Sequence, residues 1–483
     1  MPTIRSGVGW RLSPWCDVLR GETKNIILPP QTSSIAAAEA FLPTHIELRN
    51  GHLTEAGNWR RRPGYVPKWD LGVKEPVHAL IPYGNGYAVT QAGLVFELKA
   101  SGPVRLSGRL TGSRRPTWAN DNGTLILADG GVPMFVDGAE LKPLEPAASV
   151  TPLGGYPPPG KFVSTLDSYV LLAGQHPTDW NYSAVNNRAS WPLENSNAVL
   201  REGEKIEALR VFKREAYFFK SRSIEIWINI GGDQVFARTR GLIARGTKAG
   251  ASVVQANDTF YWLGDDGDFY ELSGPKNISF QHIRDTLDTI KTQADCYGFD
   301  CRAEAAIRWC FPTDGRCLVY DYAHNLWSED SVWAEGNQML PMASYMELGG
   351  EQLFGDTAAT GLIYRLSREE SQDNGRPVRV VRRFRVQLTP DGTDARVHRL
   401  RLRCQRGEGR GTVSPRALVA WRMDDGEWTV PAESDLGQLG DREPYVDLDQ
   451  LGVGREMEIE LVETDAVTWL VTDGFLTVER LGR

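Results

Sequence analysis

Residues 260–272, with the sequence Phe-Tyr-Trp-Leu-Gly-Asp-Asp-Gly-Asp-Phe-Tyr-Glu-Leu, contain the pattern that decides the fold. Two short runs of aromatic and aliphatic residues flank a turn of small and acidic residues, which is typical of a β-hairpin. Aromatic residues favour strands, whereas Gly and Asp favour the tight turn that joins them. This stretch therefore predicts the second and third strands of one small antiparallel sheet.

The same unit recurs from about residue 78 to residue 366 at intervals of 37 to 47 residues. A period of roughly 40–50 residues is that of a four-stranded β-propeller blade. A plain sandwich would not hold one period through seven units, so we predict an all-β protein with a six- or seven-bladed β-propeller. The second strands are expected to begin near Tyr87, Thr124, Tyr169, Ala216, Phe260, Ala306 and Gln352. The third strands are expected at 94–98, 133–136, 180–182, 224–228, 268–272, 317–322 and 362–366.

One helical pattern interrupts the strands. In Ile283–Ala294 the apolar residues share one helix face, which predicts an inserted helix packed on the propeller. A polar run at 371–375 marks a boundary, and the strand patterns beyond it lack the blade period. The predicted domains are an N-terminal extended arm with a closing strand (1–70), the β-propeller (71–370) and a C-terminal β-sandwich (371–483). Within the arm, we expect His45–Leu48 to help close or buttress the ring.

The composition is that of a globular protein without special affinity for phosphate. Hydrophobic residues make up 41% of the chain, and 62 acidic residues outnumber 54 Lys and Arg residues, which gives a net charge of -8. A protein that wraps nucleic acid is usually basic, so DNA binding is not the expectation from charge. The sequence shows no apolar run of signal-peptide or membrane-span length, which predicts a soluble protein that is made in a cytoplasm and has no membrane span.

The sequence contains none of the common catalytic or nucleotide-binding motifs. It lacks the phosphate-binding GxxxxGK[ST], a GxGxxG that opens a helix, HExxH and GxSxG. Cys296, Cys301, Cys310 and Cys317 have a spacing wider than the C-x2–4-C pairs of structural zinc sites. Cys310 and Cys317 flank a turn and are expected on two strands of one hairpin, as buried free thiols. We therefore predict no enzyme activity, no catalytic residues, no cofactor and no metal.

Two acidic turns resemble known local devices. Asp265–Asp268 lacks the remaining positions of an EF-hand calcium loop and lies where a hairpin turn is expected. Met423–Thr429 resembles the Asp-box hairpin of sialidases, which is a turn device remote from the active site. A sialidase would also need an arginine cluster and a Tyr/Glu pair at the propeller centre, and the sequence does not locate them.

The C-terminal domain is divided in charge. Thirteen arginines and three acids lie between Arg376 and Arg422, whereas sixteen acids and two arginines lie between Asp424 and Glu479. Alternate residues of a strand share a face, so neighbouring arginines at this spacing form rows. Such rows are either solvated strand faces or a self-complementary face between subunits. The candidate inter-subunit face contains Arg382, Arg383, Arg385, Arg399, Arg401 and Arg403.

Three stretches resemble the tail-hub (nozzle) proteins of short-tailed bacteriophages, also called packaged-DNA stabilisation proteins. The first runs from His45-Ile-Glu-Leu-Arg-Asn-Gly-His-Leu to Arg60-Arg-Arg-Pro-Gly64-Tyr. The second is residues 239–254, which lead into 260–267, and the third joins the helix at 283–294 to 317–329. The order of these elements and the chain length are similar to those of the family over about residues 45–370, with a looser match in the C-terminal sandwich.

The resemblance implies a structural virion protein that forms a ring, typically a hexamer, in the phage tail. The ring would extend the DNA channel below the portal and adaptor proteins, retain packaged DNA until ejection, and anchor tail fibre, tailspike or needle proteins. Genomic DNA would pass without sequence-specific contact, and assembly would take place in the host bacterial cytoplasm. The arginine-rich C-terminal half departs from the enteric-phage members, which leaves the distal partner open.

Two other classes of protein share the predicted propeller. The first alternative is a carbohydrate-binding or sialidase-like propeller. The second is a cellular scaffold of the WD or kelch type, whose repeated GH…WD or GG signatures are missing from this sequence.

Overall fold

The structure is a computed structural model of the 483-residue chain. It describes residues 23–28, 44–54, 58–144, 155–200, 203–334, 336–389, 392–404, 414–438, 440, 445–465 and 470–481. Most of the predicted N-terminal arm, residues 1–22 and 29–43, lies outside these ranges. The chain divides into two compact units, of which one is Pro63–Arg376 and the other combines Met1–Arg62 with Pro377–Arg483.

The unit Pro63–Arg376 is a seven-bladed β-propeller, because its described residues form seven four-stranded antiparallel groups of strands. Blade 1 consists of β6 (Val77–Ile81), β7 (Tyr87–Thr90), β8 (Val95–Lys99) and β9 (Gly102–Arg105). Blade 2 consists of β10 (Thr117–Asp121), β11 (Thr124–Ala128), β12 (Met134–Asp137) and β13 (Glu140–Pro143). Blade 3 consists of β14 (Phe162–Leu166), β15 (Tyr169–Ala173), β16 (Asp179–Tyr182) and β17 (Ser196–Ala198), and blade 4 consists of β18 (Ile206–Phe212), β19 (Glu215–Lys220), β20 (Ile224–Asn229) and β21 (Phe236–Ile243). Blade 5 consists of β22 (Val254–Ala256), β23 (Thr259–Leu263), β24 (Phe269–Glu271) and β25 (Lys276–Asn277). Blade 6 consists of β26 (Tyr297–Cys301), β27 (Ala306–Phe311), β28 (Arg316–Asp321) and β29 (Leu326–Glu329). Blade 7 consists of β32 (Met342–Leu348), β33 (Glu351–Asp356), β34 (Leu362–Ser367) and β5 (Gly64–Asp70).

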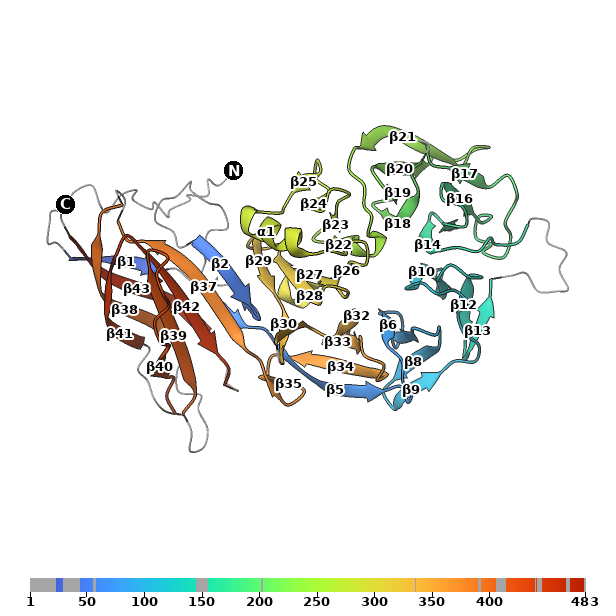
Figure 1. The fold of residues 1–483 in the computed structure, drawn as a ribbon. Helices are drawn as coiled ribbons and strands as arrows, with labels where there is room; N and C mark the ends of the chain where they lie inside the picture. The colour runs from blue at the N-terminus through green and yellow to red at the C-terminus, as the bar shows by residue number, and fades with distance from the viewer. Residues whose placement is uncertain are drawn as a thin grey trace, which may run out of the picture. The chain divides into compact units, whose positions relative to one another are not determined.

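The first strand of each blade is the innermost one. The strands β6, β10, β14, β18, β22, β26 and β32 surround the centre of the propeller, and the later strands of each blade lie outside them (Figure 1). All seven second strands begin at the predicted residue or one residue before it, and every predicted third strand overlaps the observed one. The turn Asn257-Asp258 has positive φ at both residues, as a two-residue hairpin of type I′ requires.

Strand β5 closes the ring. It pairs antiparallel with β34, so the last blade takes three strands from its end of the propeller sequence and one from the beginning. Tyr65 of β5 lies edge-on to Phe354 and Tyr364, with ring centroids 5.0 Å apart in both pairs. The closing strand is therefore β5, which lies within the predicted region 1–70. His45–Leu48 belongs to β2 (Thr44–Arg49), which pairs with β37 (Val380–Gln387) in the other unit and does not supply the fourth strand of the last blade.

A separate hydrophobic cluster fills each of the seven interfaces between neighbouring blades. Between blades 3 and 4, for example, the rings of Trp180 and Phe218 lie 4.9 Å apart. Between blades 5 and 6, the ring centroids of Phe269 and Trp309 lie 4.2 Å apart. Each blade buries both faces against its neighbours, so the stability of one blade depends on the closure of the whole ring.

The inserted helix is α1 (Gln281–Thr289), which lies between blades 5 and 6 in the sequence. Ile283, Leu287 and Ile290 are buried in the cluster between these blades, as predicted. The helix is shorter than the apolar pattern indicated, because Ile290 adopts an extended conformation. The backbone N–H groups of the next two residues then donate to the carboxylate of Asp314, which holds the chain outside the helix.

The other unit is a β-sandwich that contains strands from both ends of the chain. Its outward residues, such as Arg383 and Arg385, alternate with buried ones, such as Phe384 and Val386. The N-terminal strands β2 to β4 thus belong to this sandwich rather than to a separate arm. One sheet has the order β2-β37-β42-β39-β40, with β42 (Glu456–Glu463), β39 (Arg416–Met423) and β40 (Ala432–Asp435). The other has the order β3-β4-β43-β38-β41 and includes β1, with β1 (Thr23–Leu28), β3 (Gly51–Leu53), β4 (Trp59–Arg61), β38 (Ala395–Cys404), β41 (Tyr445–Gly454) and β43 (Leu470–Arg480).

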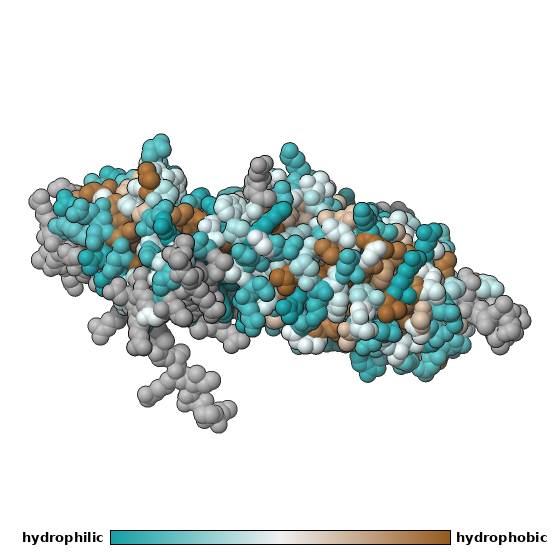
Figure 2. All heavy atoms as spheres, turned by 90° about the horizontal axis from the view of Figure 1, so that it is seen from below, coloured by the Kyte–Doolittle hydropathy of each residue, from teal (hydrophilic) through white to brown (hydrophobic). Residues whose placement is uncertain are grey.

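Short elements complete the described secondary structure. They are the 3-10 helices η1 (Gly250–Ser252) and η2 (Arg302–Glu304) and the strands β30 (Ser331–Ala334), β31 (Gly336–Met339), β35 (Gln372–Asp373) and β36 (Arg376–Pro377). No helix in the described part of the chain is long and apolar enough to cross a membrane. On the face shown in Figure 2, hydrophobic residues form small separate patches among hydrophilic ones, as on an ordinary protein surface.

Candidate functional site

The inner strands of the propeller converge on the side chain of Arg115. This arginine precedes β10 of blade 2, and its guanidinium donates to the backbone carbonyls of His78 in blade 1 (2.6 Å) and of Ala343 in blade 7. The guanidinium also lies 4.0 Å from the ring centroid of Tyr297 in blade 6. Arg115 therefore connects the inner strands of four blades, whose free edges leave backbone carbonyls without sheet partners.

A second arginine lies on an inner strand. Arg210 of β18 donates to the carbonyls of Leu209 (3.0 Å) and Val253 (3.5 Å), and the latter residue precedes β22 of the next blade. Burial lowers the pKa of Arg210 to about 10, and it lowers the pKa of Arg115 as well. Neither arginine forms an ion pair with a carboxylate among the described residues. The centre of the propeller thus contains two cations that only backbone carbonyls and one aromatic ring stabilise.

His78 shares this environment. Burial and, to a smaller extent, the positive charge of Arg115 lower the pKa of its imidazole to about 4. The imidazole is neutral at pH 7, which avoids a third positive charge at the inner strands. This arrangement can stabilise a closed ring or hold a small anion. The hydrogen-bond acceptors of Arg115 and Arg210 in the described part of the chain are backbone carbonyls.

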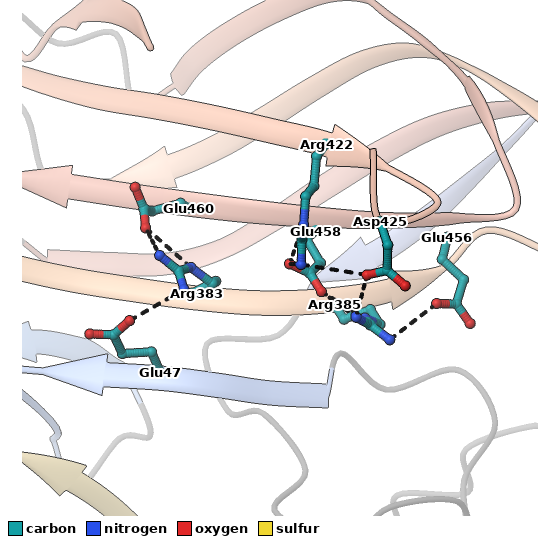
Figure 3. Close-up of polar contacts among 8 residues, drawn as sticks. All are labelled: Glu47, Arg383, Arg385, Arg422, Asp425, Glu456, Glu458 and Glu460. Carbon is teal, nitrogen blue, oxygen red and sulfur yellow. Dashed lines mark hydrogen bonds and ion pairs between the residues drawn. The ribbon is translucent and has the colours of Figure 1, made fainter. Parts of the chain in front are cut away.

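Arg383 and Arg385 of the predicted arginine face project together from β37, as expected (Figure 3). The Nε of Arg383 donates to Glu460 on β42 (3.1 Å), and its Nη1 lies 3.5 Å from Glu47 on β2. The Nε of Arg385 donates to Glu458 at 2.9 Å. Cross-strand neighbours in the same sheet therefore balance the charges of this row.

Glu458 is the centre of a larger network on the same sheet (Figure 3). It is buried, and its second oxygen accepts a hydrogen bond from Arg422 of β39 at 2.8 Å. The Oδ1 atom of Asp425 lies 2.9 Å from Nη2 of Arg385 and 3.4 Å from Nη2 of Arg422. The two arginines hold the pKa of Glu458 below its ordinary value, although burial alone would raise it.

Arg399, Arg401 and Arg403 form a second row on β38, also as predicted. Arg399 pairs with Asp449 at 2.6 Å and Arg401 with Asp447 at 2.7 Å, and both aspartates belong to β41. Arg403 lies 3.8 Å from Asp473 of β43. The acidic half of the domain is therefore the partner of the arginine-rich half within one chain, and a role of the row between subunits stays a prediction.

Arg382 does not belong to either row. Its side chain is buried on the opposite side of β37, with its guanidinium 4.9 Å from the ring centroid of Phe384 and 5.8 Å from that of Trp59. Burial lowers its pKa to about 10. The candidate face included Arg382 because of its charge, but the period of two already places it opposite Arg383.

Cys310 and Cys317 lie opposite each other on β27 and β28, as predicted. Their Sγ atoms are 3.5 Å apart, and both side chains are buried. Burial raises the pKa of Cys296 and of Cys301, which keeps these thiols protonated and unreactive. Within the described ranges, no group of three or more His, Cys, Asp or Glu residues has the arrangement of a metal site.

Both acidic turns are hairpin turns, as predicted. Asp265–Asp268 joins β23 to β24, where Arg245 pairs with Asp266 at 2.8 Å and Asp266 accepts a hydrogen bond from Tyr270. Burial and this carboxylate raise the pKa of Tyr270 to about 12. At the other turn, Asp424 has positive φ, and its Oδ1 accepts hydrogen bonds from the backbone of Arg455 (2.8 Å) and Glu456 (2.9 Å).

Arg115 and Arg210 are not among the residues predicted from the sequence, because nothing local distinguishes them. Each is one arginine among many, and the partners of Arg115 are distant in sequence. The one available signal was position: Arg115 precedes an inner strand and Arg210 lies within one. The blade period located those strands without indicating which side chains face the centre.

The fold and the inner strands together define a seven-bladed β-propeller protein. Among solved structures, the chain is similar to the WD40 domain of Pan2 from Neurospora crassa, with 11% identity, a TM-score of 0.38, and coverage of 66% of this chain and 98% of that one. It is also similar to YCF48 from Cyanidioschyzon merolae, with 12% identity, a TM-score of 0.39, and coverage of 64% and 99%. A third structure is a putative 6-phosphogluconolactonase from Bacteroides fragilis, with 11% identity, a TM-score of 0.35, and coverage of 55% and 85%. No family model and no curated protein matches the chain.

Proposed function

We propose that this protein is a tail-hub (nozzle) subunit of a short-tailed bacteriophage. In this role it is a structural virion protein that forms a ring below the portal and adaptor, retains packaged DNA and anchors distal tail proteins. The observation that carries the proposal is the position of α1. This helix is inserted between blades 5 and 6 of a seven-bladed propeller, in the order that the resemblance to tail-hub proteins implies.

The rigidity of the propeller supports this role. A subunit that holds back packaged DNA must resist force without exposing long open strand edges. Here β5 pairs with β34 to close the ring, seven separate clusters fill the blade interfaces, and Arg115 connects four inner strands. These features resist the separation of neighbouring blades, because every interface would have to expose buried apolar surface.

The charge of the chain also supports this role. A channel for a stiff polyanion must let phosphate pass without holding it, and a basic channel would bind DNA strongly at low salt. A net charge of -8 avoids that attraction. Four arginines of the sandwich rows have carboxylate partners within their own domain, which reduces their attraction for DNA: Arg383, Arg385, Arg399 and Arg401.

Negative-stain electron microscopy of the purified protein, combined with sedimentation, tests the proposal. We expect closed rings with a central hole, in equilibrium with monomers at low protein concentration. A protein that stays monomeric at high concentration, and that is not found in the tail of a phage particle, would contradict the proposal.

A carbohydrate-binding or sialidase-like propeller is the second candidate. The observation that favours it is the position of Trp118, which is 40% exposed on the inner strand β10, three residues after Arg115. An exposed indole can stack on a sugar ring, and an arginine can bind a sugar carboxylate. We propose that the protein nevertheless has no hydrolytic or transfer activity. Turnover of a sialoside that a single Asp or Glu substitution in the propeller abolishes would favour this candidate over the tail hub.

A further inference from the structure

The two ends of the propeller differ in how their cations are paired. In each blade the first strand runs from one end to the other, and the second strand returns. The start of the first strand and the turn between strands two and three therefore lie at the same end, which we call the entry face. The turn between strands one and two lies at the opposite end, which we call the exit face.

On the exit face, cations pair with carboxylates of neighbouring blades. Arg214, in the turn of blade 4, lies 3.1 Å from Asp167 in the corresponding turn of blade 3. Lys213 lies 3.1 Å from Asp258 in the corresponding turn of blade 5. These two cations of the exit face thus have carboxylate partners within the propeller.

On the entry face, four cations of blades 2 to 5 have no carboxylate partner within ion-pair distance in the described part of the chain. We call these four residues the basic arc: Arg114, Lys161, Arg222 and Lys248. The nearby acidic residues have other partners. Glu207 pairs with Lys205 at 3.1 Å, and Asp129 is buried with its carboxylate accepting the backbone N–H of Gly131. Asp265 and Asp266, in the entry-face turn of blade 5, pair with Arg245 at 3.3 and 2.8 Å.

Contacts between the loops bring Arg114 close to Lys161, and the turn of Arg222 close to the segment of Lys248. A Cβ atom on Gly130 would lie 3.7 Å from Lys161 and 3.8 Å from Arg114, so these two side chains border the same turn. The turn that contains Arg222 is bonded on one side to Lys205, through the N–H of Ser221 (3.1 Å). On its other side, the N–H of Thr247 donates to the carbonyl of Lys220 at 2.9 Å, next to Lys248.

The turn of Arg222 also has a rigid base. Lys220 and Glu225 flank it and form a fully buried ion pair of 2.7 Å, which Glu204 joins at 3.1 Å from the same ammonium. The Oγ of Ser223, inside the turn, donates to Glu204 at 2.6 Å. A surface that is held in place in this way loses little conformational entropy when it binds a partner.

Arg114 destabilises the charged form of Lys161 within the basic arc. Burial and, next, the charge of Arg114 lower the pKa of Lys161. A bound anion would relieve both the repulsion and the desolvation of the ammonium. This relief is a source of binding free energy that the paired cations of the exit face do not offer.

We propose that the basic arc is a docking site for an extended acidic segment of a partner protein. A flexible peptide can follow cations that are distributed over four adjacent blades, whereas duplex DNA is stiff over about 150 bp and would touch only part of a curved arc. The net charge of -8 would also repel a long polyanion beyond the arc. This inference does not depend on the tail-hub proposal, because it rests on the entry face of a single propeller.

Fluorescence anisotropy with the full-length protein tests the proposal. The probe is a short labelled peptide of alternating Glu and Ser, and the comparison probes are single-stranded and duplex DNA of equal net charge. We expect the peptide to bind at low salt and the double variant Lys161→Glu/Arg222→Glu to weaken binding by about tenfold or more. The double variant Lys213→Glu/Arg214→Glu, on the exit face of the same blade as Arg222, changes the net charge by the same amount. It is the matched control and should leave binding unchanged.

Three outcomes would overturn the proposal. The first is the absence of peptide binding at low salt. The second is equal weakening by Lys213→Glu/Arg214→Glu, which would indicate an effect of net charge alone. The third is that either DNA probe binds more tightly than the peptide and that the double variant loses this DNA binding. That result would identify the basic arc as a nucleic-acid-binding surface. If the double variant does not fold, Arg222→Ser and Lys248→Ser remove exposed charges and should each weaken peptide binding.

Discussion

The ammonium of Lys220 on β19 lies 2.7 Å from Oε1 of Glu225 on β20, and both side chains are fully buried. The same ammonium donates to the carbonyl of Leu200 at 2.7 Å. The backbone N–H of Leu200 in turn donates to Glu225 at 2.9 Å. One buried cation thus connects a β-hairpin of blade 4 to the segment that precedes the blade, and these contacts partly offset the desolvation of the charges.

Replacing Lys220 should destabilise the propeller strongly. Lys220→Met leaves the carboxylates of Glu225 and Glu204 buried without a cation, which costs about 3–5 kcal/mol of unfolding free energy. Denaturant unfolding of the full-length protein measures the loss. Lys142→Met is the matched control, because Lys142 pairs with Asp137 on the surface and should show no measurable change. Equal stability of the two variants would show that the buried pair contributes nothing.

The ring closure at Tyr65 should be equally sensitive. Tyr65→Ala removes a buried ring that contacts Phe354 and Tyr364, which costs about 3–5 kcal/mol. Hydrogen exchange should increase first in β34, which loses its partner strand when β5 detaches. Tyr156→Ala, at a side chain that is 63% exposed, is the control. Uniform exchange across all blades in Tyr65→Ala would contradict closure by β5.

The blade strands and the closing strand differ in how far the sequence could predict them. The blade period depends on local hairpins such as Phe260–Leu272, so strand positions followed from residue type alone. The closing strand has no such hairpin, because its partner β34 lies about three hundred residues further along the chain. Strand β5 also contains Pro67, which is tolerated at the outer edge of a blade. A proline within a run of residues argues against a strand, so the sequence pattern does not reveal β5. Closure is a long-range property that local periodicity does not contain.

His78 should make the stability of the protein depend on pH. The imidazole has a pKa of about 4 in the folded protein and an ordinary value of 6.5. Between these values the unfolded chain binds more protons than the folded one. The contribution of His78 to the free energy of unfolding is therefore fully present above pH 6.5 and decreases as the pH falls towards 4. His78→Gln should flatten this part of the stability profile. An unchanged profile would show that other groups cause the acid sensitivity.

Arg115 contributes to the low pKa of His78 and to the bonding of the inner strands. In Arg115→Met the imidazole pKa should rise but stay below 6.5, because burial is the larger cause. Histidine NMR resonances followed over pH measure this change. The variant also loses the hydrogen bonds to two backbone carbonyls, so its unfolding free energy should decrease. A pKa that stays near 4 would indicate that Arg115 does not affect the imidazole.

The candidate site was predictable only where a strand imposes a period. Arg399, Arg401 and Arg403 share a face because alternate strand residues must do so. The same rule places Arg382 inside, although its charge favours the surface, and packing on Phe384 and Trp59 accommodates it. Which carboxylates face the rows depends on the register of β38 with β41, and no residue pattern determines that register from the sequence alone.

Arg401 and Asp447 provide a way to separate the two interpretations of the arginine rows. They pair across β38 and β41, as do Arg399 and Asp449 beside them. A charge reversal at the arginines alone would place carboxylates opposite carboxylates and would disturb the fold as well as any interface. The better variant neutralises both partners at once: Arg399→Gln, Arg401→Gln, Asp447→Asn and Asp449→Asn. It removes two of the three arginines of the row together with their partners and keeps the net charge.

We expect this quadruple variant to fold and to sediment like the parent at low and at high salt. The pairs are exposed on the sandwich surface, and exposed pairs contribute little to stability. Because each arginine already has a carboxylate partner in its own chain, no second subunit is needed to balance it. If the variant folds but forms fewer rings at low salt, the arginines also act between subunits, and their internal pairs are exchanged on assembly. Circular dichroism of the same samples distinguishes that result from a loss of fold.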